Sequence, residues 1–223
     1  MNFKLFIQAI VKFLIGLIII AALLFVPANT LLYWNGWLFI GLLFIPMFIA
    51  GIILMIKNPD LLKRRLDAKE KENSQKIVIL LSAFMFISGF IVAGLNYKYE
   101  WIVLPNSVII VSSILFMVAY IMYAEVLREN TYLSRTVKVE ENQKVIDTGL
   151  YGIVRHPMYA TTILLFLTIP LILGSIISFL IFLIYPFIIG IRMKNEEKVL
   201  EENLAGYKDY KIKVKYRIIP FIW

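Results

Sequence analysis

Long runs of apolar side chains constrain the fold of this chain more than any other feature. They cover residues 6–26, 36–56, 77–95, 106–123 and 158–191. An α-helix needs about 20 apolar residues to cross the hydrocarbon core of a bilayer, and it satisfies its backbone polar groups internally. With 61% hydrophobic residues and a mean hydropathy of +0.82, the 223-residue chain is too apolar for a soluble domain. The sequence therefore predicts an all-α polytopic membrane protein.

The last apolar run, residues 158–191, is long enough to cross the membrane twice. Pro170 and the pair Gly174-Ser175 interrupt it. Proline removes a helix donor, and a Gly-Ser pair favours a turn. We therefore expect a C-terminal hairpin of two shorter helices, which brings the total to about six transmembrane helices. One long broken helix is the alternative.

Basic residues lie almost entirely on one side of the predicted spans. Residues 27–35 contain no Lys or Arg, and residues 96–105 contain only Lys98. Because Lys and Arg concentrate in cytoplasmic loops, both termini and the long loops are predicted to be cytoplasmic, with the plasma membrane as the expected location. The same rule accounts for the formal net charge of +8. The charge thus indicates contact with membrane lipids and no nucleic-acid partner.

The residue inventory narrows the possible chemistry. The chain has no cysteine and a single histidine. A disulfide framework and a thiolate nucleophile are therefore excluded, and no metal site is expected because no cluster of His, Asp and Glu has ligand spacing.

Polar residues concentrate in two segments, residues 125–159 and 192–223. The hairpin would return the chain to the same membrane face and bring the two segments together. Arg192 and Glu196 are four residues apart, so they share one helix face. A charge at a membrane edge is costly unless it is paired or functional, although each residue alone also fits an interfacial or solvated role. We expect four spans in residues 1–125 and a catalytic region in residues 126–223.

A further helix is predicted near the C-terminus. Val199, Leu200, Leu204 and Tyr207 recur at intervals of three and four residues, as on one face of an amphipathic helix. Its apolar face would lie on the bilayer or close over a pocket.

Three motifs occur in a fixed order. They are Gly149-x-Tyr151-x-x-x-Arg155-His156-Pro157-x-Tyr159, then Arg192-x-x-x-Glu196-Glu197 after the hairpin, then Tyr207-x-x-Tyr210 with Tyr216-Arg217-Ile218-Ile219-Pro220. Over roughly residues 131–223 this combination resembles the isoprenylcysteine carboxyl methyltransferase family. Upstream, Asn58-Pro59-Asp60-Leu61-Leu62 is similar to bacterial members.

The resemblance implies an S-adenosylmethionine-dependent membrane methyltransferase without a Rossmann domain. The cofactor-binding residues it implies are Gln143, Lys144, Val145, Ile146, Tyr151, His156, Pro157, Met158, Tyr159 and Glu196. Arg192 would face the methyl acceptor, and Glu197 would take a proton from an amine acceptor. Gln143 and Lys144 depart from the family's usual block. Separately, Ala160-Thr161 replaces the glycine often found just after the tyrosine.

The acceptor implied by the resemblance is lipophilic or lipidated and carries a carboxylate or an amine. An isoprenylcysteine-like group, a phospholipid amine and another isoprenoid all fit this description. Two other functions stay open. Membrane sterol or enone reductases that use NADPH have a similar Arg-His-Pro-x-Tyr loop, but usually have Asn at the position of Met158. A small transporter is the other, although the span interiors lack the ionisable residues of a solute path.

Overall fold

The computed structural model describes residues 3–67, 73–134, 136, 139 and 141–222, and every regular element in these residues is helical. Five helical stretches are long and apolar enough to cross a membrane, and the 16-residue α6 is a shorter apolar helix. The all-α polytopic fold is thereby confirmed. The elements are α1 (Phe3–Ala28), α2 (Trp34–Lys57), α3 (Pro59–Leu66), α4 (Asn73–Tyr99), α5 (Asn106–Glu129), the 3-10 helix η1 (Gly149–Gly152), α6 (Pro157–Ile172), α7 (Ile176–Phe182), α8 (Tyr185–Asn203) and α9 (Tyr207–Lys213).

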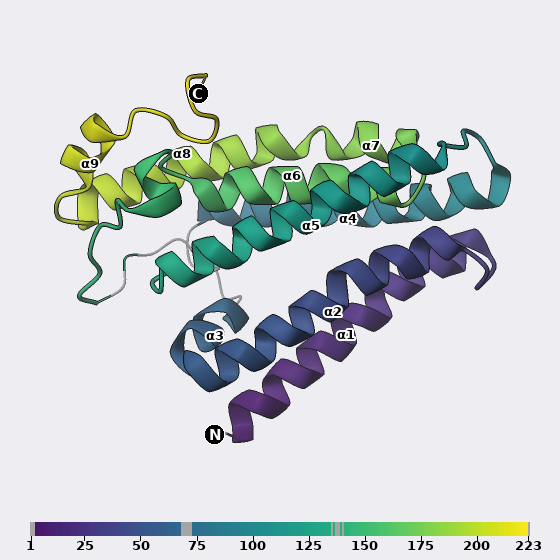
Figure 1. The fold of residues 1–223 in the computed structure, drawn as a ribbon, viewed down its shortest axis with the longest axis horizontal. Coiled ribbons are helices and arrows are strands. Elements are labelled where there is room, and N and C mark those ends of the chain that lie inside the picture. Colours follow the sequence, from purple (N-terminus) through teal and green to yellow (C-terminus); the bar gives the residue numbers. More distant parts are fainter. Residues whose placement is uncertain (1–2, 68–72, 135, 137–138, 140, 223) are drawn as a thin grey trace.

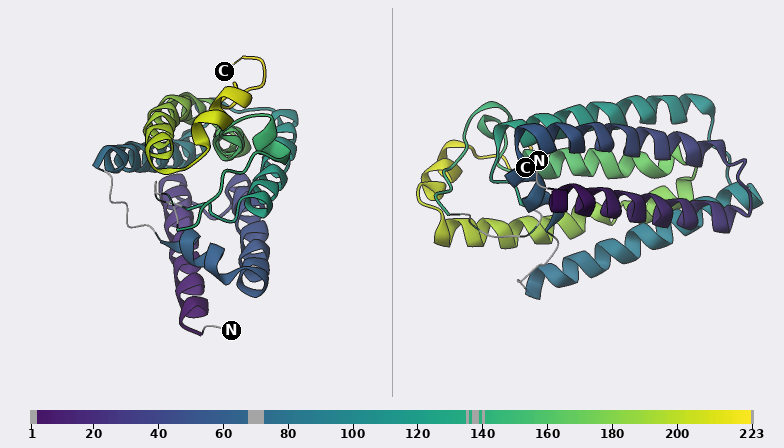
Figure 2. Two further views of the ribbon diagram at one scale, coloured as in Figure 1. Left: turned by 90° about the vertical axis from the view of Figure 1, so that its left-hand side faces the viewer. Right: turned by 90° about the horizontal axis from the view of Figure 1, so that it is seen from below.

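The long helices run side by side along the long axis of the molecule (Figure 1). Helix α5 packs on α6, and α4 packs on both α1 and the α7–α8 stretch. Helices α1 and α2 form a pair that diverges from the others toward α3 (Figures 1 and 2). The short helices α3 and α9 lie at one end of the bundle, here called the α9 end, and both chain termini lie toward it.

Residues 158–191 form a hairpin, so the alternative of one broken helix is wrong. Helix α6 runs away from the α9 end, and α7 and α8 return alongside it (Figure 1). Pro170 lies inside α6, and the reversal occurs after it at Gly174, whose φ of +75° favours glycine. The Ser175 side chain then caps α7 by accepting a hydrogen bond from the Ser178 N–H at 3.2 Å.

The hairpin tip is attached to the neighbouring helices by side chains that donate to its carbonyl groups. Asn35 Nδ2 donates to the Ile172 oxygen at 3.0 Å, and the Tyr33 hydroxyl donates to the Leu173 oxygen at 2.6 Å. Both donors lie at the start of α2, so the tip lies level with the ends of the long helices. At 1.5 Å per residue, α6 is only about 24 Å long. Helix α6 is therefore somewhat shorter than the roughly 30 Å thickness of a hydrocarbon core.

Aromatic side chains join the hairpin to α4. The Phe86 ring of α4 meets Phe166 of α6 and Phe182 of α7 edge-on, with centroid distances of 4.8 and 5.3 Å. Phe166 also packs on Tyr185 of α8 at 4.7 Å. Edge-to-face contacts of this kind stabilise packing beyond the area they bury. They hold all three hairpin helices in one arrangement.

The C-terminal segment differs from the single helix that was expected. Helix α8 ends at Asn203, and α9 begins only at Tyr207, so Val199 and Tyr207 belong to different helices. Leu204, Tyr207, Tyr210 and Val214 form a small core against Leu200 and the loop residues Val139 and Val145. The apolar residues that suggested one helix are buried against this loop from two separate helices. Their spacing therefore does not require one continuous helix.

Candidate active site

A cavity opens at the α9 end, between the loop after α5, η1, the start of α6, the last turns of α8, and α9. Its empty volume, counted with the open mouth, is about 730 Å³. Nine of the ten predicted cofactor-binding residues line it: Gln143, Lys144, Val145, Ile146, Tyr151, His156, Met158, Tyr159 and Glu196. Pro157, Arg192 and Glu197 are not among the lining residues.

The Gly149-x-Tyr151 motif forms η1, and its glycine is needed for a close approach. Gly149 has a φ of +51°, and a Cβ at this position would overlap the carboxylate of Glu129. That carboxylate accepts a hydrogen bond from the Leu150 N–H at 3.0 Å. The end of α5 thereby fixes η1 and places the Tyr151 ring in the cavity wall.

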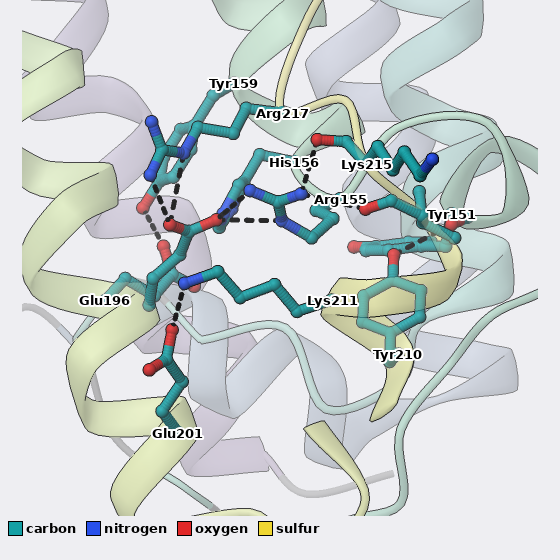
Figure 3. Close-up of polar contacts among 12 residues, drawn as sticks. Tyr151, Arg155, His156, Tyr159, Glu196, Glu201, Tyr210, Lys211, Lys215 and Arg217 are labelled. Carbon is teal, nitrogen blue, oxygen red and sulfur yellow. Dashed lines mark hydrogen bonds and ion pairs between the residues drawn. The ribbon is translucent and has the colours of Figure 1, made fainter. Parts of the chain in front are cut away.

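Tyr151 connects the loop, η1 and α9. Its hydroxyl accepts a hydrogen bond from Asn130 Nδ2 at 3.1 Å. Its carbonyl accepts one from the Tyr210 hydroxyl at 2.7 Å (Figure 3). Burial raises the pKa of both tyrosines, so each hydroxyl keeps its proton at neutral pH. The Tyr210 contact holds α9 over the cavity.

The Arg155-His156 segment pairs with the C-terminal tail through the backbone. The Arg155 N–H donates to the Tyr216 oxygen at 2.9 Å, and the His156 N–H donates to the Arg217 oxygen at 2.8 Å. The Arg155 guanidinium also donates to the carbonyl oxygens of Val214 and Lys215, at 2.8 and 2.7 Å (Figure 3). The tail is therefore part of the site's framework.

The buried Glu197 carboxylate lies between the guanidinium groups of Arg155 and Arg217 and the His156 ring. Its Oε1 accepts from Arg155 Nε at 2.9 Å and contacts His156 Nε2 at 3.2 Å, while its Oε2 accepts from Arg217 Nε at 3.1 Å. The Glu197 side chain is 4% exposed. A carboxylate whose two oxygens are both held by guanidinium groups is a poor proton acceptor. The predicted role of Glu197 as a base therefore does not fit this geometry.

Glu196, the next residue, points differently. Its Oε2 accepts a hydrogen bond from the Tyr159 hydroxyl, and Arg192 Nε donates to the same hydroxyl at 3.1 Å (Figure 3 labels Tyr159 and Glu196). The Tyr159 ring stacks on His156 with a centroid distance of 5.6 Å. As their spacing predicted, Arg192 and Glu196 share a helix face, and Tyr159 links them at the base of the cavity.

Several residues of the site were not identified from the sequence. Arg65 of α3 contacts the Tyr123 hydroxyl and lies 4.0 Å from the Met158 sulfur. Asn130 and Tyr207 also line the cavity. The Tyr207-x-x-Tyr210 repeat was the available signal for α9, whereas a basic loop gives no indication of which arginine contacts the site.

Residues 106–206 match the family model described as phospholipid methyltransferase. The matched segment contains α5, η1, the hairpin and α8, and therefore most of the cavity wall. Comparison with curated proteins gives no match. The match supports a membrane methyltransferase, the same family that includes the isoprenylcysteine carboxyl methyltransferases. Residues 106–206, somewhat under half of the chain, are thus similar to the phospholipid methyltransferase family of membrane methyltransferases.

Proposed function

We propose that this chain is an S-adenosylmethionine-dependent methyltransferase that acts at the cytoplasmic face of the plasma membrane on a lipophilic acceptor. One observation carries the proposal: residues that the family resemblance assigns to the cofactor, from Gln143 to Glu196, line a single cavity. The basic loops, which lie on the side of the α9 end, support the cytoplasmic orientation of both termini.

The chemistry of the cavity wall fits this cofactor. S-adenosylmethionine carries an ammonium, a sulfonium, two ribose hydroxyls and an aromatic base. Among the described residues that line the cavity, the one carboxylate is Glu196, which suits a cationic or hydroxyl-bearing group. Val145, Leu200 and Leu204 provide apolar wall for the base. When bound, the cofactor would supply an electrophilic methyl group, and the chain's own task would be to position the acceptor and exclude water.

Arg192 is proposed to orient the acceptor. It lies one helical turn before Glu196 on α8, and its contact with the Tyr159 hydroxyl holds the guanidinium beside the cavity. A guanidinium suits a carboxylate through paired hydrogen bonds. A carboxylate acceptor is already nucleophilic and needs no base. Because Glu197 is held by cations, we favour a carboxylate acceptor, with an amine as the alternative.

The depth of the site supports an acceptor that arrives from the bilayer. The first residue of α6 lies about 24 Å from the hairpin tip, so the cavity begins near the level of the lipid headgroups. A prenylated carboxylate or another anionic amphiphile would present its polar end at this level. Membrane lipids are thus the expected surroundings and the expected source of the substrate.

The first test is calorimetric titration of the detergent-purified protein with S-adenosylmethionine, with NADPH in parallel. We expect saturable binding of S-adenosylmethionine that is lost in Glu196→Ala and kept in Glu202→Ala, an exposed carboxylate on the same helix. Binding of NADPH alone would support a reductase, and binding of neither ligand would refute an enzyme of either kind.

The acceptor class is tested by methyl transfer from radiolabelled S-adenosylmethionine. Vesicles would contain either a farnesylated cysteine analogue or phosphatidylethanolamine. A methyl ester releases methanol in alkali, whereas an N-methyl group resists it. We expect alkali-labile label with the prenylated carboxylate. Alkali-stable label with phosphatidylethanolamine would instead establish an amine acceptor.

A further inference from the structure

The Tyr207 side chain is buried, but its hydroxyl has no hydrogen-bond partner among the described residues. The residue is 4% exposed and lines the cavity. Its ring is fixed by the Tyr210 ring at 5.8 Å, and its N–H donates to the Leu204 oxygen at 3.2 Å. Buried polar atoms in native proteins nearly always have a partner, so an unpartnered one in a residue that lines a cavity needs an explanation.

The other tyrosines of the cavity wall are used differently. Tyr151 accepts from Asn130, Tyr159 donates to Glu196, Tyr210 donates to the Tyr151 carbonyl, and the Tyr132 hydroxyl donates to the Asn142 oxygen at 3.3 Å. Each of these four hydroxyls therefore joins two parts of the wall. Tyr207 makes no such connection within the described chain.

Tyr207 also differs from the other buried polar atoms without partners. Those atoms belong to Arg64, Gln75 and Asn96. Each of these side chains makes a hydrogen bond through another of its atoms. The hydroxyl is the one polar group of the tyrosine side chain, so the whole hydrogen-bonding capacity of the Tyr207 side chain is unused among the described residues.

From these observations we infer that the Tyr207 hydroxyl is a ligand-binding group that donates a hydrogen bond to an acceptor atom of bound S-adenosylmethionine. The inference rests on the proposed function. Burial, together with the nearby carboxylates of Glu197 and Glu196, raises the pKa of Tyr207. The hydroxyl therefore keeps its proton and acts as a donor. Helix α9 would thus both line the cavity and form a hydrogen bond to the cofactor.

The test is Tyr207→Phe, studied by calorimetry with S-adenosylmethionine and with S-adenosylhomocysteine, and by thermal unfolding without ligand. We expect the affinity for S-adenosylmethionine to fall about three- to tenfold, the effect of one hydrogen bond. The unfolding temperature of the ligand-free protein should stay the same or rise, because phenylalanine removes a buried hydroxyl that has no partner.

Tyr210→Phe is the matched control, since it removes a hydroxyl from the same helix that does have a partner. It should lower the unfolding temperature of the ligand-free protein by breaking the contact with the Tyr151 carbonyl. If wild-type protein binds S-adenosylmethionine and Tyr207→Phe binds it equally well, the inference is wrong and the proposed function stands. A fall in unfolding temperature matching that of Tyr210→Phe would overturn it too. If wild-type protein binds no S-adenosylmethionine, both proposals fail.

Discussion

The two ends of the bundle both bury polar groups, but they do so in different ways. At the hairpin tip, neutral side chains such as Asn35 and Tyr33 each donate to one backbone carbonyl. At the α9 end, Glu197 is surrounded by Arg155, His156 and Arg217. A neutral hydrogen bond adds to the stability of the fold by itself. Buried ionic groups stabilise the fold only when each charge has a partner of opposite charge. At the tip, each hydrogen bond therefore stabilises the helix packing independently. At the α9 end, stability depends on Glu197 and its partners all being present.

The largest effect is expected from Glu197→Ala. It leaves the buried Arg155 side chain, 4% exposed, without its counter-charge, and breaking such a pair costs about 3–5 kcal/mol. Unfolding followed by circular dichroism should show this loss, and S-adenosylmethionine binding should disappear with it. Glu202→Ala is the control. Unchanged stability in Glu197→Ala would mean that the cluster does not organise this end.

The second-largest loss of stability is expected from Gly149→Ala, where η1 meets the end of α5. Alanine would adopt a positive φ and place a methyl group on the Glu129 carboxylate. We expect about 2 kcal/mol of lost stability from this strain, with weaker binding of S-adenosylmethionine because Tyr151 moves. Gly152→Ala, in the same short helix at a negative φ, should cost less. Equal effects of the two substitutions would contradict the need for glycine at residue 149.

At the tip, Asn35→Ala should have a smaller effect of about 1–2 kcal/mol, because it leaves the Ile172 carbonyl without its donor. The two ends should differ most in how a substitution affects S-adenosylmethionine binding. Once folded, this variant should bind S-adenosylmethionine with wild-type affinity. Weakened binding would show that the tip and the cavity are coupled through α6.

The smallest effect is expected at the surface, from the ion pair of Asp147 and Lys213 at 2.7 Å. The hydrogen bond and charge of Lys213 lower the pKa of Asp147. A carboxyl with a lowered folded-state pKa adds stability above its unfolded pKa and loses it as pH falls through the folded value. Asp147→Asn should thus lower the unfolding temperature slightly at neutral pH and not in acid. A large effect at neutral pH would contradict its assignment as a screened surface pair.

The spans and the hairpin could be predicted because apolar runs and turn residues are local signals. The nine predicted residues that line the cavity came from the family resemblance, and the hairpin brings Glu196 of α8 back beside those that precede or begin α6. The environment of Glu197 could not be predicted, since three of its partners come from two distant coil segments. Neither segment has a repeating pattern of apolar residues from which the backbone pairing of Arg155 with Tyr216 could be predicted. For the same reason, adjacent carboxylates at residues 196 and 197 looked alike in sequence but have different surroundings.

In the orientation proposed above, the shortness of α6 would make the position of the cavity depend on the thickness of the surrounding bilayer. The tip of the hairpin is fixed level with the long helices, so a thicker membrane would draw the cavity mouth below the headgroups, and a thinner one would lift it toward the aqueous phase. Mismatch of a few ångströms has a modest energetic cost that proteins and lipids share. The length of the lipid acyl chains would then set how readily a ligand from the aqueous phase and a ligand from the bilayer meet in the cavity.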